Sequence, residues 1–271
     1  MKHSSPLPAH PPLLAQYVAS ADAPTWRQFR DEQRAAYQEL CVELHHRQRG
    51  LCAFCEIGLI TSVETDAREV EHWRPKSFDV PPSIRWTFGI DNLQLGCLGG
   101  SKRYPADDVD LTGNPEPGPN RSCGAQKGNE NPALGIAGVV PYRPEDIPES
   151  PAMFSVSDDG SLRPADDCAA HGLDPVRMWI TIDYLGLNCT RLKNARRTIL
   201  LALDQALLDY VDAAVGASDD ERFDAAYRDL ARDTAPPTTG TLPRFVTTLR
   251  SFFGGGLDNV LFPEPGWSVA P

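Results

Sequence analysis

Four cysteines constrain the fold of this chain more than any other feature of its sequence. Cys52 and Cys55 are separated by two residues, and Cys97 and Cys123 follow at long intervals, each in a glycine-flanked turn. A two-residue gap allows both thiolates of such a knuckle to reach one tetrahedral Zn²⁺ at roughly 2.3 Å. We therefore expect a Cys₄ zinc site that joins three distant segments of the chain.

Two other interpretations of Cys52 and Cys55 stay open. A redox pair would require a helix N-terminus in a βαβ setting, and two incidental buried thiols would require no partner at all. The chain has seven cysteines, an odd number, which in a reducing compartment favours metal ligands or buried thiols over disulfides. The cysteines outside the expected site should pack in the interior; they are Cys41, Cys168 and Cys189.

Composition excludes several classes of protein. The formal net charge of -11 argues against a freestanding, avid binder of nucleic acid, because phosphate contacts are made mostly by lysine and arginine. A nuclease with this balance must concentrate its positive charge locally or borrow affinity from a partner. No apolar run approaches the roughly 18 residues of a membrane helix, and residues 1–12 lack the apolar core of a signal peptide. We expect a cytoplasmic protein without a membrane segment.

Periodicity and turn residues predict an α+β protein with a mostly helical body around a small, metal-rich insert that contains β-strands. One long helix is expected from Thr25 to Arg49, with Gly50 as its cap. The other expected elements are strands over 66–72 and 92–97 with a loop over 73–90 between them, an irregular insertion over 99–121, a hairpin over 154–162, and helices over 175–186, 189–215 (capped by Asn188), 219–232 (with a Ser218/Glu221 capping box) and 242–253. We divide the chain into an N-terminal helical segment (1–50), a zinc-containing core (51–135) and a C-terminal hairpin and helical region (136–271).

Glu71 and His72 lie between the two halves of the expected zinc site. A lone histidine is most often a structural residue, but this one follows a carboxylate and is enclosed by candidate zinc ligands. Phosphodiester hydrolysis requires a base that titrates near neutral pH, which is the range of histidine, and a hard divalent ion. Carboxylate and amide oxygens, here those of Glu71 and Asn92, suit Mg²⁺. Neighbours on a strand point to opposite faces, so the pair requires a strand end or a bulge at His72.

These motifs resemble the HNH (ββα-metal) endonuclease family, and more narrowly the PtuB-like HNH proteins of Septu and retron defence systems. The resemblance spans about residues 13–200. It is carried by 50–56 (GLCAFCE), 70–77 (VEHWRPKS), 92–97 (NLQLGC) and 123–128 (CGAQKG), with weaker support from Trp26, Phe29 and 185–197.

The resemblance implies a small zinc-stabilised ββα-metal core and a role for each motif residue. His72 would be the general base, Glu71 and Asn92 would lie at a catalytic Mg²⁺ or Mn²⁺, and Lys127 would lie near the scissile phosphate. The four cysteines would hold a structural zinc. The chain departs from the family at the third letter of H-N-H, because Gly124 and Ala125 after Cys123 cannot bind a metal. Gln126, Lys127 or Asn129 could substitute, or fewer protein groups could hold the ion.

The resemblance also implies partners. They are nucleic acid, DNA in preference to RNA, and an ABC-type ATPase of the same defence system. Arg74 and Lys76, which adjoin the base, are the candidate phosphate contacts. The basic cluster Arg191, Lys193, Arg196 and Arg197 is interpreted as the solvated face of a helix rather than as a phosphate contact. The alternative function is a non-catalytic, zinc-scaffolded adaptor that docks on a partner protein, which the missing third HNH residue favours.

Overall fold

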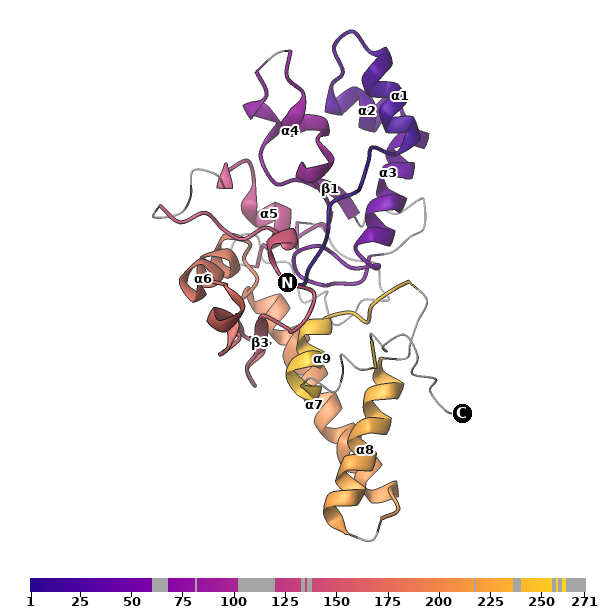
Figure 1. Ribbon diagram of the computed structural model, residues 1–271, viewed down its shortest axis with the longest axis vertical. Coiled ribbons are helices and arrows are strands. Elements are labelled where there is room, and N and C mark those ends of the chain that lie inside the picture. Colours follow the sequence, from indigo (N-terminus) through magenta and orange to yellow (C-terminus); the bar gives the residue numbers. More distant parts are fainter. Residues whose placement is uncertain are drawn as a thin grey trace.

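The computed structural model describes residues 1–59, 68–80, 82–101, 120–132, 135, 138–216, 218–235, 240–254, 257 and 260–261. Helices dominate these residues and surround two small antiparallel sheets (Figure 1). The helices are α1 (Pro12–Ser20), α2 (Trp26–Glu32), α3 (Arg34–Arg47), α4 (Arg85–Phe88), α5 (Cys123–Lys127), α6 (Pro175–Tyr184), α7 (Thr190–Ala213), α8 (Asp219–Thr234) and α9 (Val246–Phe253). The strands are β1 (Arg68–His72), β2 (Leu93–Cys97), β3 (Phe154–Val156) and β4 (Leu162–Pro164). The predicted α+β mixture is therefore present.

The prediction of a single helix from Thr25 to Arg49 is wrong. The helix is interrupted at Gln33, which separates α2 from α3. The Trp26 and Tyr37 rings lie 6.1 Å apart. In one straight helix these residues would be separated by about 16 Å along the axis. No proline or glycine marks the break, which brings the rings of Trp26 and Phe29 in α2 against Tyr37 in α3.

The predicted cap at Gly50 is only partly correct. Gln48 is the C-cap and Arg49 is the first left-handed residue (φ 55°), while Gly50 (φ 80°) closes the turn by donating its N–H to the His45 carbonyl (2.9 Å).

β1 and β2 form the central antiparallel sheet, with Arg68 opposite Cys97 and His72 opposite Leu93. The two expected strands are thereby confirmed, although residues 66–67 lie outside the described residues. The intervening segment, expected to be a loop, contains α4 and short turns of 3-10 helix. α5 follows and contacts β2. Most of the insertion predicted for 99–121 lies outside the described residues.

The C-terminal half largely follows the sequence prediction. The β3–β4 hairpin, α6, α7, α8 and α9 are present, and the Ser218/Glu221 capping box is formed. We had expected Asn188 to cap α7, but the N-cap residue is Cys189. Its amide instead accepts from the Leu162 N–H (2.7 Å) and donates to the Leu162 carbonyl (2.9 Å), so it fastens the hairpin to the helix. α7 and α8 pair along one arm that extends away from the sheet (Figure 1).

Two hydrophobic clusters fill the interior. The larger one combines side chains of α1–α3, the cysteine segments, the hairpin and α6, so it crosses the proposed boundaries at residues 50 and 135. The smaller cluster lies between α7, α8 and α9. The division into three segments stays a prediction. Within the described residues, no helix is both long and apolar enough to cross a bilayer.

Buried Glu56 connects the cysteine knuckle to the C-terminal helix. Its carboxylate accepts hydrogen bonds from the backbone N–H (2.8 Å) and the hydroxyl of Thr247, and its carbonyl accepts from the Phe245 N–H (2.9 Å). A buried carboxylate requires such donors, because burial removes its hydrating water. Glu56 therefore fixes α9 against the residues that follow Cys55.

We expect Glu56→Gln to lower the free energy of unfolding by about 2 kcal/mol, because hydrogen bonds to a buried charged group are stronger than those to a neutral amide. Urea denaturation followed by circular dichroism measures the change. Glu149→Gln is the matched control, since the Glu149 side chain is 60% exposed and its ion pair with Arg49 is long (3.9 Å). Equal midpoints for the two variants would show that Glu56 does not hold α9 in place.

Candidate active site and cysteine cluster

The four predicted zinc ligands meet at one place. Cys52 and Cys55 lie in a short knuckle after α3, Cys97 ends β2, and Cys123 begins α5. Their sulfur atoms all lie within 4.8 Å of one another, and the separations are 3.8 Å (Cys52–Cys123), 3.5 Å (Cys55–Cys97) and 3.7 Å (Cys97–Cys123). Four ligands at about 2.3 Å around a tetrahedral ion would be about 3.8 Å apart. The cluster could thus hold a metal ion such as zinc.

The surroundings of the cluster agree with a metal centre better than with the two alternatives. All seven cysteines lie in the described part of the chain and none forms a disulfide. The knuckle follows the end of α3 rather than opening a helix, which disfavours a redox pair. Burial raises the pKa of the Cys55 and Cys123 thiols well above the usual value, so a bound cation would be required to keep the sulfurs ionised. Cys41, Cys168 and Cys189 are buried outside the cluster, as expected.

A cleft of about 150 Å³ lies beside the cluster and contains most of the predicted catalytic residues. It is lined by Trp26, Arg30, Glu69, Val70, Glu71, His72, Pro75, Lys76, Lys127, Gly128 and Asn129. Four consecutive residues of β1 belong to this lining. β1 ends at His72, and residues from both faces of the strand line the cleft, so the adjacent Glu71 and His72 can both belong to it.

His72 is held firmly and in one protonation state. Its side chain is 5% exposed, its Nε2 lies 3.0 Å from the carbonyl oxygen of Thr87, and its ring packs edge-on against Trp26 at 4.4 Å. A carbonyl only accepts, so Nε2 carries the proton and Nδ1 keeps a lone pair. Burial, and then the charge of Lys76, lower the pKa of His72 to about 3. The imidazole is therefore neutral at physiological pH.

Glu71 lies against the start of α5 and beside Glu69. A Cβ atom at Gly124 would lie only 1.7 Å from Oε1 of Glu71, so the carboxyl group occupies the space of a side chain at that position. Burial, and then the charge of Glu69, raise the pKa of Glu71 to about 7, while Lys127 opposes this shift. Glu69 was missed by the sequence analysis. Its two-residue spacing from Glu71 on a strand could have revealed it, because such residues share a face.

Lys127 and Lys76 supply positive charge to the cleft. Lys127 is 3% exposed, and its Nζ donates to the Gly128 carbonyl at 3.1 Å. Burial lowers the pKa of Lys127, and the charge of Glu71 opposes this effect. Lys76 extends over the Trp26 ring, with Nζ 6.0 Å from its centroid. The two predicted cations thus lie with Glu71 and His72.

Asn92 is not among the residues that line this cleft. Its side chain is buried, and Oδ1 accepts from the Arg74 N–H at 2.7 Å, while Nδ2 donates to the carbonyls of Arg74 (3.0 Å) and Trp86. The Asp79 carboxylate accepts two further hydrogen bonds, from the N–H groups of Trp86 (2.9 Å) and Thr87 (2.8 Å). These contacts fix the loop after β1 and hence the Thr87 carbonyl that orients His72. Among the described residues, the hydrogen bonds of the Asn92 side chain all go to backbone groups, and its predicted place at a catalytic metal stays a prediction.

Arg74 also lies apart from the cleft. Its guanidinium group stacks over the Trp86 ring at 4.3 Å, and it lines a separate small hollow with Trp86 and Arg177. Of the two predicted phosphate contacts, only Lys76 is next to His72. Stacking of this kind places an arginine and an aromatic face together at the surface.

The basic cluster on α7 is only partly the solvated face that we expected. Arg191 and Arg196 are buried, at 5% and 3% exposure, and Lys193 forms an ion pair with Asp159 at 2.7 Å. Arg191 donates to the Ser122 hydroxyl (2.8 Å), and Arg196 donates to the Gly160 carbonyl (3.2 Å). The charge of Arg196 interacts with Cys55 and Cys123. These two arginines therefore belong to the interior around the cysteine cluster.

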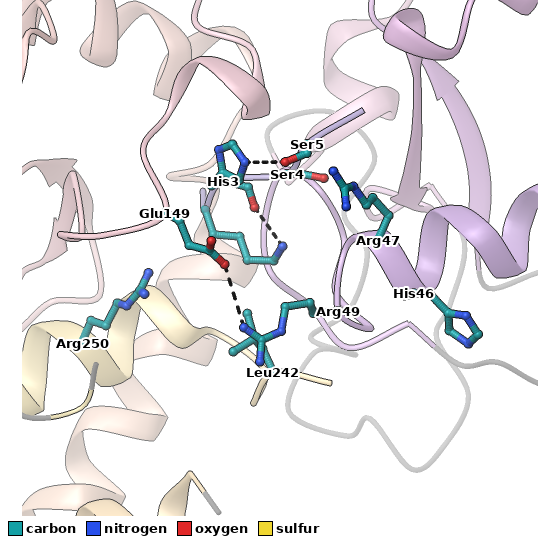
Figure 2. Close-up of a pocket in the computed structure, with 10 residues that line it drawn as sticks. His3, Ser4, Ser5, His46, Arg47, Arg49, Glu149, Leu242 and Arg250 are labelled. Atoms are coloured by element: carbon teal, nitrogen blue, oxygen red, sulfur yellow. Dashed lines mark hydrogen bonds and ion pairs between the residues drawn. The ribbon is translucent and has the colours of Figure 1, made fainter. Parts of the chain in front are cut away.

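A second hollow, of about 250 Å³, gathers positive charge from three distant segments (Figure 2). Its lining comprises Lys2, His3, Ser4, Ser5, His46, Arg47, Arg49, Glu149, Leu242 and Arg250. The Lys2 amine donates to the His3 carbonyl (3.0 Å). Figure 2 shows Arg49 facing Glu149. This second hollow shares no residue with the cleft at β1. Its lining contains a single carboxylate, Glu149, so it is a poor alternative site for a catalytic metal. Sequence reasoning missed it, although 45–49 (HHRQR) is a basic run.

The variant Asn92→Asp distinguishes two roles for Asn92: a structural role, in which its amide holds the backbone of the loop after β1 (the clamp), and a role as metal ligand. The new carboxylate oxygen would face the carbonyls of Arg74 and Trp86 and repel both, so we expect a loss of stability of about 2–3 kcal/mol. Asp91→Asn is the neighbouring control, because Asp91 is 44% exposed. Thermal denaturation measures both. If Asn92→Asp were as stable as wild type, the clamp assignment would be incorrect, since a metal-ligating position would accept a carboxylate.

Comparison with known proteins agrees with this site. No family model matches the chain. The chain is similar to a protein of Escherichia coli named as a candidate HNH endonuclease of retron Ec83. The two sequences are 31% identical over 203 residues, which cover 69% of this chain and 75% of the relative. This degree of similarity over most of both chains, together with the histidine and the four cysteines, shows that the chain belongs to the HNH endonuclease family.

Proposed function

We propose that this protein is a metal-dependent endonuclease that hydrolyses phosphodiester bonds, with His72 as the general base. The observation that carries the proposal is the fixed tautomer of His72. Nε2 is bound to the Thr87 carbonyl, and Nδ1 has no partner among the described residues of the cleft. A neutral imidazole with a free lone pair is suited to take a proton from water. Its pKa of about 3 lies below the near-neutral range of a general base, and the negative charge of a bound phosphate would raise this pKa because it favours the imidazolium.

The other cleft residues have complementary parts in the same reaction. A divalent cation such as Mg²⁺ or Mn²⁺, when bound, would neutralise charge on the scissile phosphate. Glu71 offers it a hard oxygen ligand, and that carboxyl already borders the start of α5. His72 accepts the proton of the attacking water at Nδ1, and the Lys127 and Lys76 ammonium groups attract the phosphate oxygens. Asn92 and Asp79 act as positioning residues, because they hold the loop that carries the Thr87 carbonyl.

We further propose that the cysteine cluster holds a structural Zn²⁺ and that the sheet and α5 form the ββα-metal core of the family. The sulfur separations of 3.5–3.8 Å support zinc, as does the burial of all four ligands. The seven unbridged cysteines support a reducing compartment, the cytoplasm.

The proposed biological role is that of effector in an anti-phage defence complex with an ABC-type ATPase, acting on DNA in preference to RNA. The retron context of the relative supports a defence role. A net charge of -11 supports a partner that contributes affinity for the target. Among the described residues, the basic hollow of Figure 2 and the lysines of the cleft are two places that gather positive charge.

Metal analysis tests the zinc centre. We expect one zinc per chain in the wild type and a loss of zinc and of thermal stability in Cys97→Ser, because ligand binding and folding are coupled in such sites. Cys41→Ser is the matched control, since Cys41 is a buried cysteine outside the cluster. Full zinc occupancy in Cys97→Ser, or none in the wild type, would contradict the assignment.

Cleavage assays test the enzyme. With Mg²⁺ or Mn²⁺, plasmid, single-stranded DNA or RNA, and with or without the ATPase, we expect His72→Ala to lower the cleavage rate by about 10²–10⁴-fold. Zinc content should remain at the wild-type value, because the histidine lies outside the cysteine cluster. The control is His171→Ala, whose side chain is 40% exposed. Wild-type protein that cuts no substrate in any of these mixtures would support the adaptor instead.

A further inference from the structure

We propose that the basic hollow of Figure 2 binds a phosphate monoester, which is the terminal phosphate of a nucleotide or of a nucleic acid strand. This site is additional to the cleft at β1, with which it shares no residue, and it does not depend on the proposed nuclease function. Its volume of about 250 Å³ is far larger than the ~10–15 Å³ that a single water molecule needs. A group of several heavy atoms therefore fits.

Two buried polar side chains of the N-terminal segment line the hollow and lack protein partners. Ser4 is 2% exposed, and its hydroxyl has no hydrogen-bond partner among the described residues. Lys2 is 6% exposed, and in the same part of the chain its amine has one acceptor, the His3 carbonyl at 3.0 Å. An ammonium group has three N–H donors, so two of them are left over. Buried donors normally have acceptors, and a ligand with several oxygens would supply them.

The backbone holds these donors in place before any ligand arrives. The Ser4 N–H donates to the Pro144 carbonyl (3.2 Å), and Nδ1 of His3 lies 2.5 Å from the Ile147 carbonyl oxygen. Nε2 of His3 also contacts the Ser5 hydroxyl at 2.7 Å, as Figure 2 shows. Donors fixed in this way lose little conformational freedom on binding, which favours affinity.

The charge of the hollow matches a dianion. Its lining contains four cations, Lys2, Arg47, Arg49 and Arg250, and one carboxylate, that of Glu149, so positive charge is in excess by three. A phosphate monoester carries a charge of about −1.5 to −2 at pH 7, whereas a phosphate within a strand carries one negative charge.

Burial adds to this preference. Burial lowers the pKa of the Lys2 amine to about 8, although the charge of Glu56 opposes this effect. A bound anion would favour the charged form of Lys2 and offset the cost of burying it.

The depth of the donors favours a terminal phosphate over one within a strand. Lys2, Ser4 and Arg250 are buried, whereas Arg47 in the last turn of α3 is exposed. A monoester has a single ester bond and can enter a hollow end-on, while a diester is extended by the chain on both sides. Arg47 is then available at the rim for the outer phosphate oxygens, since a guanidinium pairs well with phosphate.

Isothermal titration calorimetry with matched ligand pairs tests the site on full-length protein. One pair is a short oligonucleotide with a phosphate at its 5′ or 3′ end and the same oligonucleotide without it; the other pair is adenosine monophosphate and adenosine. Inorganic phosphate reports on the group alone. Mg²⁺ and Mn²⁺ are left out, so hydrolysis does not interfere. We expect the phosphorylated member of at least one pair to bind about tenfold more tightly or better.

Ser4→Ala and Arg47→Gln test the residues. Ser4→Ala removes a hydroxyl that has no protein partner, and Arg47 is exposed, so both variants should keep the wild-type melting temperature. Each should raise the Kd of the phosphorylated ligand about tenfold. The matched controls are Ser20→Ala and Arg27→Gln, which alter exposed residues outside the hollow and should leave that Kd unchanged. If Ser4→Ala is unfolded, Arg47→Gln decides by the same criterion.

The outcomes separate the site from its absence and one source of phosphate from the other. Equal affinity within both ligand pairs, no binding of any ligand, or unchanged affinity in a folded Ser4→Ala or Arg47→Gln overturns the proposal. A phosphate-dependent gain that both variants lose supports it. If the gain is confined to the oligonucleotide pair, the ligand is a strand end; if adenosine monophosphate shows the same gain, a free nucleotide suffices. Cleavage activity, present or absent, alters none of these outcomes.

Discussion

The meeting of four cysteine sulfurs is the constraint on which the rest of the structure depends. The central sheet consists of two five-residue strands, which would be only marginally stable in isolation. Cys97 ends one of these strands, Cys123 begins α5, and the knuckle of Cys52 and Cys55 packs beneath the sheet. Gln48 reinforces this junction, because its amide exchanges hydrogen bonds with the N–H and C=O of Leu95 (both 2.7 Å). A metal ion at the cluster would add its binding free energy to the stability of the whole core.

Burying such a cluster also determines the charges around it. Four thiolates around one Zn²⁺ would carry a net charge of -2, and the low dielectric of the interior makes an uncompensated charge costly. Arg196 is buried within the reach of Cys55 and Cys123, and Arg191 donates to Ser122, the neighbour of Cys123. Both arginines extend inward from α7, so this helix contributes positive charge next to the cysteine cluster. This accounts for two buried cations in a chain that is acidic overall.

The candidate active site is lined by residues of β1, and its neighbours hold its side chains in place. The loop after the strand is fixed by Asn92 and Asp79, and this loop presents the carbonyl that orients His72. Trp26 of α2 covers one side of the ring, whereas α5 borders the carboxyl of Glu71. A base and an acidic pair therefore share one small cleft although they leave opposite faces of the strand.

The sequence by itself determined the chemistry of this protein, because metal ligands and catalytic groups are fixed by residue type and local spacing. The CxxC pair, the Glu71–His72 dipeptide, the hairpin and the Ser218/Glu221 capping box are local patterns, and each could be recognised without knowledge of contacts. Contacts between distant residues could not. The break between α2 and α3 accompanies contacts between aromatic rings of the two helices, the engagement of Asn92 follows from a loop that folds back on it, and the burial of Arg191 and Arg196 follows from the docking of α7. The tertiary structure alone decided that Glu71 fills the space above Gly124 beside Glu69, because that arrangement depends on how a strand and a helix some fifty residues apart approach each other.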